Sequence, residues 1–270
     1  MKEVMASEPQ SYVNEANQIV VSHNQNCFLL SGHTHNVYSL EARRIGSRLL
    51  LVSAGQIGRR RHGAILWNLE QHHPFAISLL PSSPSWSATT ALSHDGTLAT
   101  VAFPEEPIRV WRVPFPGTVQ PPIEGPVIRA AKGVAFSLDA QELAVVDTSE
   151  PLRRFRLSSG RLQEIPHAPP IRGRFVAYDR MGNMLVVTEN GMLRIDHSNH
   201  VAPIPTPDLA SFICTRLTAD ASLLLTEQDS ELRIQDVQQV DTKRIPLRPS
   251  DGGSAADSMR RRRRTWQCAS

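Results

Sequence analysis

The sequence has 270 residues, of which 40% are hydrophobic and 20% are charged, and its net charge is +3. This composition supports a sizeable core and excludes a disordered or collagen-like chain. Near the end of the chain stand five consecutive arginines, namely Arg260, Arg261, Arg262, Arg263 and Arg264. Their five positive charges exceed the net charge of the whole chain, which falls from +3 to −2 without them. The nearly neutral remainder argues against a broad electrostatic surface for nucleic acid.

The sequence shows no signal peptide and no membrane-spanning segment. Its first ten residues lack the apolar core of a signal peptide, and the apolar run near Leu49–Val52 is too short to cross a bilayer. Cys27, Cys214 and Cys268 are widely spaced and odd in number, which fits neither a disulfide framework nor a metal site. We therefore predict a cytoplasmic protein with free thiols and no membrane partner.

The chain opens with an incomplete unit of three predicted strands, at residues 3–7, 18–22 and 27–31. Nothing before them offers a further, inner strand. Either this unit has three strands, or the chain is a fragment of a longer one, and we favour the fragment.

The next unit begins at Gly32–His33 and contains an insertion, Gln56–Gly63, before its third strand. The insertion carries a basic run, Arg59–Arg61, followed by His62. A solvated loop is the favoured interpretation, and a face for an acidic partner is the alternative.

The clearest unit follows. Its first strand is predicted at Thr89–Ser93, a turn at Asp95–Gly96, a second strand at Leu98–Ala102 and a third at Ile108–Trp111. Asp-Gly between apolar runs is a strong hairpin signal, because glycine accepts a positive φ without a Cβ clash.

The pattern repeats along the chain. Short apolar alternations end at positions separated by 45, 44, 44, 41 and 39 residues, and the turn aspartates are separated by 44, 40 and 41. The alternations end at Ser22, Trp67, Trp111, Phe155, Asp196 and Gln235, and the turn residues are Asp95, Asp139, Asp179 and Asp220. A period of about 40–45 residues with four strands is typical of a propeller blade.

We therefore predict an all-β fold, a β-propeller of about six four-stranded blades with the first incomplete. The predicted units lie near residues 2–31, 32–86, 87–129, 130–171, 172–213 and 214–248. Residues 249–270 are rich in Gly and Ser before the arginine run, and this composition predicts a disordered tail.

The repeat resembles the WD-repeat family of β-propellers over roughly residues 2–247. The resemblance rests on Gly32–His33, on Ser93–Leu98 and on the unit ends Trp67–Asn68 and Trp111–Arg112. It implies that His33, Ser53 and Trp67 form part of the hydrogen-bonded network of that family. The family's buried Asp before the third strand is not evident, so we expect the blades to rest mainly on apolar packing.

The predicted structural repeat positions belong to the hydrogen-bonded network, to the turns or to the ends of the units. They are Gly32, His33, Ser53, Trp67, Asp95, Gly96, Trp111, Asp139, Phe155, Asp179 and Asp220. The turn aspartates belong to different blades, where Asp is favoured for its local backbone hydrogen bonds, so we interpret them as structural rather than as paired catalytic carboxylates.

No motif in the sequence predicts catalysis. A Gly-x-Ser-x-Gly elbow and a phosphate-binding Gly-rich loop are both missing. The pairs His33/His35, His72/His73 and His197/His200 lack a clear set of Cys or acidic co-ligands, so we predict no metal and no cofactor.

WD-repeat proteins are mostly platforms in multiprotein assemblies, and the resemblance therefore implies a non-catalytic scaffold that binds proteins or peptides. The alternatives are a hydrolase-like or lactonase-like enzyme that uses the central channel, and the sensor part of a larger multidomain protein.

The arginine run could be a nuclear-import signal or a nucleic-acid contact, against a merely solvated tail. Each of its members, Arg260, Arg261, Arg262, Arg263 and Arg264, is therefore a candidate interaction residue. Nuclear localisation is thus the alternative to cytoplasmic.

Overall fold

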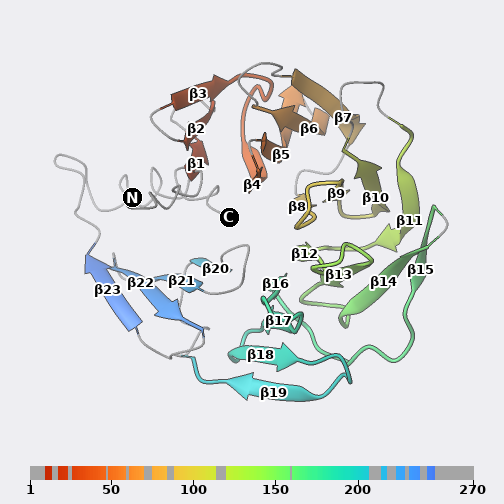
Figure 1. Ribbon diagram of the computed structural model, residues 1–270, viewed down its shortest axis with the longest axis vertical. Helices are drawn as coiled ribbons and strands as arrows, with labels where there is room; N and C mark the ends of the chain where they lie inside the picture. Colours follow the sequence, from red (N-terminus) through yellow and green to blue (C-terminus); the bar gives the residue numbers. More distant parts are fainter. Residues whose placement is uncertain are drawn as a thin grey trace.

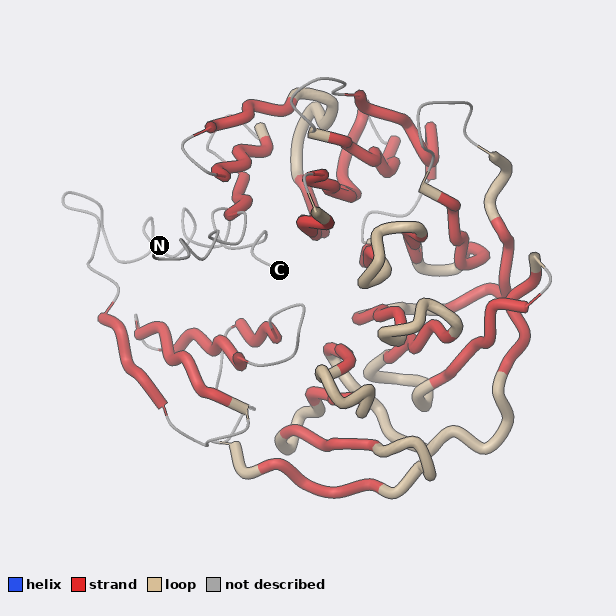
Figure 2. The backbone as a smooth tube through the Cα atoms, in the orientation of Figure 1, coloured by secondary structure: helices blue, strands red, loops and turns tan. Residues whose placement is uncertain are grey.

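A computed structural model describes residues 10–13, 18–23, 26–46, 48–58, 61–69, 75–83, 88–113, 120–158, 160–206, 214–217, 223–228, 231–237 and 242–246. These residues form strands joined by turns and loops and contain no helix (Figure 2). No helix in this part of the chain is therefore long and apolar enough to cross a membrane. The all-β prediction is confirmed.

The strands form six separate antiparallel sheets, which we number as blades 1 to 6 in chain order. Blade 1 contains β1 (Gln10–Val13), β2 (Ile19–His23) and β3 (Asn26–Leu30). Blade 2 contains β4 (Val37–Ile45), β5 (Arg48–Gly58), β6 (Arg61–Asn68) and β7 (Phe75–Ser83). Blade 3 contains β8 (Thr89–Leu92), β9 (Leu98–Ala102), β10 (Glu106–Arg112) and β11 (Ile123–Ile128).

The remaining three blades have four strands each. Blade 4 contains β12 (Gly133–Phe136), β13 (Glu142–Val146), β14 (Arg153–Ser158) and β15 (Arg161–Glu164). Blade 5 contains β16 (Phe175–Tyr178), β17 (Met184–Val187), β18 (Met192–Ile195) and β19 (Val201–Ile204). Blade 6 contains β20 (Cys214–Leu217), β21 (Leu223–Gln228), β22 (Glu231–Asp236) and β23 (Thr242–Pro246).

The blades stand around a common centre (Figure 1). The first strands of blades 2 to 6, namely β4, β8, β12, β16 and β20, contact one another in succession on the inside of the ring. This is the arrangement of a β-propeller, and over the described residues the prediction of about six blades with an incomplete first one is confirmed.

Blade 1 contains a strand that the sequence analysis did not predict: β1 at Gln10–Val13, paired with β2 through Val13 and Ile19. The strand predicted at residues 3–7 lies outside the described residues. The connection between the paired strands is therefore short, as in most hairpins. Within the described part of the chain, blade 1 has three strands.

The structure of blade 2 corrects one prediction of the sequence analysis. The segment Gln56–Gly63 was expected to be an inserted loop, but it lengthens a hairpin: Gln56 pairs with His62 and Gly58 with Arg61. His62 is consequently a buried strand residue, 6% exposed, while Arg59 and Arg60 lie outside the described residues.

The hydrophobic core lies between the blades. Each of five clusters combines residues of two neighbouring sheets, so that each interface between blades (a seam) has its own core. In the seam between blades 2 and 3, for example, Leu50 and Leu66 pack against Leu92 and Trp111. Strands buried on both faces explain the near-continuous apolar runs in the sequence.

The seam between blades 2 and 3 also has a polar inner edge. Ser39 on β4 lies 2.8 Å from Thr90 Oγ1 at the start of β8, and Arg43 lies 3.2 Å from His94 just after that strand. Between these two contacts Glu41 accepts a hydrogen bond from Arg43 Nη2 at 3.0 Å. Burial raises the pKa of Glu41 despite this guanidinium.

Replacing Gly133 with alanine is expected to destabilise the seam between blades 4 and 5. A Cβ at Gly133 would lie 3.0 Å from Phe175 Cα and 3.0 Å from Val176 N, which are backbone atoms of β16. Overpacking of this kind costs about 2 kcal/mol, measurable by urea denaturation. Gly58→Ala is the matched control, because its nearest contact would be 3.9 Å away. Equal stability of the two variants would contradict this account of the seam.

Candidate functional site

The structure brings together His33, Ser53 and Trp67 in blade 2. Ser53 on β5 has no exposed surface, and its Oγ accepts a hydrogen bond from Trp67 Nε1 at 2.9 Å. The same Oγ lies 2.8 Å from His33 Nε2 and 3.5 Å from the carbonyl of Ile65. Gly32 packs here too, since a Cβ on it would lie 3.0 Å from the Trp67 ring.

His33 is held in its neutral form. Burial lowers its pKa to about 4, and its second ring nitrogen, Nδ1, is buried without a hydrogen-bond partner in the described part of the chain. An unpaired ring nitrogen is less costly as an acceptor than as an N–H donor. We therefore place the proton on Nε2, which donates to Ser53 Oγ, while Ser53 donates toward Ile65.

The shifted pKa makes folding stability depend on pH. Because the pKa of His33 is lower in the folded protein (about 4) than in the unfolded chain (6.5), neutral His33 contributes about 3 kcal/mol above pH 6.5. This contribution is lost as pH falls from 6.5 toward 4. Denaturation midpoints at a series of pH values should fall less steeply for His33→Gln than for the wild type. If the midpoints of the two proteins fell equally steeply with pH, the lowered pKa of His33 would be refuted.

The aspartates Asp95, Asp139 and Asp179 each organise their own turn. Asp95 Oδ1 accepts hydrogen bonds from Ser93 Oγ at 2.6 Å and from Thr97 N at 3.0 Å. Asp139 bonds Ser137 in the same way at 2.6 Å, and Asp179 accepts from the backbone of its own turn. Gly96 follows Asp95 with a φ of 67°. The three carboxylates serve separate blades.

The other predicted repeat positions are aromatic. Trp67, Trp111 and Phe155 occupy the third strands of three successive blades and are 5%, 2% and 0% exposed. Asp220 and the pair His72/His73 lie outside the described residues.

The arginine run of the tail also lies outside the described residues. This applies to all five of its members, Arg260, Arg261, Arg262, Arg263 and Arg264. Their role in nuclear import or in a nucleic-acid contact therefore stays a prediction from composition.

The repeat network is structural, and the surface offers a different candidate for binding. We call the two sides of the ring the link face and the turn face. The link face carries the hairpins between second and third strands and the connections from blade to blade. The turn face carries the hairpins between first and second strands and between third and fourth strands.

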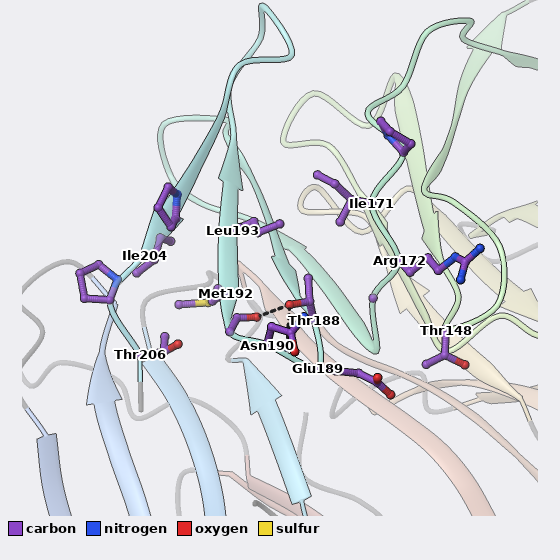
Figure 3. Close-up of a pocket in the computed structure, with 15 residues that line it drawn as sticks. Thr148, Ile171, Arg172, Thr188, Glu189, Asn190, Met192, Leu193, Ile204 and Thr206 are labelled. Carbon is purple, nitrogen blue, oxygen red and sulfur yellow. Dashed lines mark hydrogen bonds between the residues drawn. The ribbon is translucent and has the colours of Figure 1, made fainter. Parts of the chain in front are cut away.

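A groove of about 710 Å³ lies on the link face (Figure 3). One wall is the connection from blade 4 to blade 5 around Ile171–Gly173, the floor is the β17–β18 hairpin at Thr188–Leu193, and the other wall is Pro203–Thr206. We call this the link-face groove. Its size is in the range of ligand-binding pockets.

Hydrogen bonds fix the groove's shape. Thr188 donates to the carbonyl of Gly191 through its amide at 2.8 Å and its hydroxyl at 2.9 Å, which closes the hairpin tip. Gly173 N donates to Asp147 O at 2.8 Å and ties the first wall to blade 4. On the opposite wall, Gln235 of blade 6 donates to Pro205 O at 2.9 Å. The groove is therefore preorganised by three blades.

The groove's chemistry suits binding of an extended segment. Its surface combines proline rings, Ile171, Met192 and Ile204 with hydroxyl and amide groups. Glu189 is paired with Arg174 at 3.0 Å, whereas Arg172 is exposed and forms no ion pair within the described residues. The part of the chain that the structure describes contains no group of three or more His, Cys, Asp or Glu side chains placed to hold a metal ion.

Sequence reasoning missed this groove. Its walls come from connections rather than from the repeat pattern, and Ile171 and Pro203 are 32 residues apart in the sequence. The one available signal was the clustering of prolines at residues 166–170 and 203–207.

The sheet order defines a β-propeller, and the blade 2 network resembles the one expected from the WD-repeat family. No family model matches the sequence, and a search of curated proteins found no match. The chain is similar in structure to the β-propeller domain of Cps50 (Swd1) from Myceliophteria thermophila, with a TM-score of 0.60 and 14% sequence identity. The alignment covers 87% of this chain and 82% of that one. At this identity the likeness shows the fold alone.

Proposed function

We propose that the chain is a non-catalytic scaffold that binds other proteins or peptides, and that the link-face groove holds an extended peptide. The groove itself carries the proposal: it is wide, built on hydrogen-bonded turns and lined by both apolar and polar groups. A rigid groove binds a flexible segment with little ordering cost on the scaffold's side.

The charges of the groove indicate an acidic ligand. Because Glu189 is already paired, the exposed guanidinium of Arg172 is the charge left to select a partner. A carboxylate on the peptide opposite Arg172 would form a charge-assisted hydrogen bond.

A displayed library of random peptides, selected on the intact protein, tests this proposal. We expect the selected peptides to contain Asp or Glu and to bind Arg172→Glu about tenfold more weakly than the wild type. Arg161→Glu is the matched control, since Arg161 is also exposed but lies on β15 outside the groove. Selected peptides that bind all three proteins equally, or that are basic, would overturn the proposal.

The arginine tail carries a separate proposal about localisation, based on its composition. A run of five arginines, Arg260–Arg264, can serve as a nuclear-import signal. Deleting residues 259–270 should then abolish nuclear accumulation of a fluorescent fusion, and an unchanged distribution would remove this role.

A further inference from the structure

A second pocket, of about 390 Å³, lies on the turn face between blades 4 and 5. Its walls come from the β12–β13 turn, the β16–β17 turn and the β18–β19 turn, and Arg154 of β14 reaches into it from blade 4. We call it the seam pocket. Successive hairpins of an antiparallel sheet lie at opposite ends, so the seam pocket is on the opposite side of the ring from the link-face groove.

Two buried hydrogen-bond donors in the lining of the seam pocket have no acceptor. Tyr178 is 6% exposed, and its hydroxyl meets no acceptor in the described part of the chain, since the nearby guanidinium of Arg154 can only donate toward the phenol oxygen. Arg154 donates from Nη1 to Asn199 Oδ1 at 2.6 Å and from Nη2 to Glu142 Oε2 at 2.5 Å, but its buried Nε is also without a partner. Leaving such groups unpaired is unfavourable, and a ligand with an acceptor would remove this cost.

The Tyr178 hydroxyl keeps its proton and so remains a donor. Burial raises the pKa of Tyr178 and outweighs the nearby guanidinium of Arg154, which acts in the opposite direction.

Hydrogen-bond acceptors occupy the more exposed part of the pocket. Asp139 is exposed, and its Oδ1 is used by Ser137 and by the amide of Gln141, whereas Oδ2 accepts no hydrogen bond from the residues described. Asp196 likewise uses Oδ1 within its own turn, and its side chain is 43% exposed. The pocket therefore has donors at its buried end and carboxylates at its mouth.

The charges of the lining disfavour an anion. Three carboxylates, of Asp139, Glu142 and Asp196, outnumber the two guanidinium groups, of Arg154 and Arg180. A neutral carbonyl oxygen satisfies the buried donors without this repulsion, and an NH₂ group beside it would meet the carboxylates at the mouth. A primary carboxamide has both groups.

We propose that the seam pocket binds the side-chain carboxamide of a Gln or Asn in a segment of a partner protein. The carbonyl accepts from Tyr178 Oη and Arg154 Nε, and the amide nitrogen donates to Asp139 Oδ2. The donors are covered in the free protein, so the ligand displaces a side chain on entry. Met181, which is 75% exposed and lines the pocket, has the greatest freedom to move. Exposed turns around the mouth leave room for the rest of the partner segment.

Three nearly isosteric probes test the proposal by NMR titration of the intact protein: N-acetyl-glutamine methylamide and its glutamate and methionine counterparts. The glutamine probe should shift the Arg154 Nε–H resonance saturably and bind about tenfold more tightly than either counterpart. Tyr178→Phe should remove most of this preference. The control Tyr38→Phe should leave the preference unchanged, because Tyr38 lies in blade 2, where its ring centroid is 5.5 Å from that of His62.

Stability distinguishes lost binding from unfolding. Since the buried Tyr178 hydroxyl has no acceptor among the described residues of the free protein, Tyr178→Phe should keep or raise the melting temperature and not lower it. Equal or tighter binding of the glutamate probe, undiminished binding by Tyr178→Phe, or no saturable shift with any probe would overturn the proposal. Tighter binding of free glutamine than of the glutamine probe would overturn the protein segment as the ligand. None of these outcomes depends on the link-face groove.

Discussion

Replacing Ser53 with alanine is expected to lower the free energy of unfolding by about 3 kcal/mol. The Ser53 hydroxyl is fully buried and is shared by Trp67 Nε1 and His33 Nε2, so its removal leaves two buried groups unpaired. Each unpaired group costs about 1–3 kcal/mol, whereas the lost volume is small. Denaturation by urea, with the midpoint and slope both fitted, measures the effect.

A double-mutant cycle shows whether the loss comes from the network. Trp67→Phe keeps an aromatic ring in the seam but removes the N–H donor. In the Ser53→Ala background this second substitution should cost at least about 1 kcal/mol less than in the wild type, because the acceptor is already gone. If the two costs were additive, Ser53 and Trp67 would act independently. That result would contradict the hydrogen bond of 2.9 Å between them.

Phe155→Ala is expected to have the largest effect, a loss of about 3–5 kcal/mol. Phe155 on β14 has no exposed surface and belongs to the core between blades 3 and 4, with Ile108, Phe136 and Leu143. Rigid strands on both sides cannot collapse into the space, so the cavity persists. The expected result is a large shift in the urea midpoint with the slope unchanged.

Val127→Ala is the control for this cavity. Val127 lies on β11, at the outer end of blade 3, and is 54% exposed, so its truncation should change stability by less than about 0.5 kcal/mol. If Phe155→Ala were as mild as this control, the seam would not be the main source of cohesion between blades.

Much of the fold could be predicted from the sequence repeat. The spacing of Trp67, Trp111 and Phe155 reflects one position on the third strand of three blades, and Asp95, Asp139 and Asp179 mark the equivalent turns. These signals are local: an Asx-type turn and an alternation of apolar residues need only a few neighbouring residues to form. That is why the all-β fold and the blade count could be predicted.

The errors arose where local signals were weak. The strand β1 at Gln10–Val13 was not predicted, because its composition gives no apolar run, yet Val13 pairs with Ile19 of β2. The insertion in blade 2 contains charged residues and glycine, which suggested a loop, but backbone pairing between Gln56 and His62 continues the hairpin. Pairing between strands overrides composition in both cases.

The sequence by itself determined the repeating unit, its turns and the side chains of the blade 2 network, because each depends on residues within one blade. The tertiary structure alone decided the two binding surfaces. The link-face groove joins Ile171 to Pro203 and is braced by Gln235, and the seam pocket joins Arg154 to Tyr178. Such sites arise only when rigid blades pack side by side, and the spacing of residues along the chain does not encode which groups then remain unpaired.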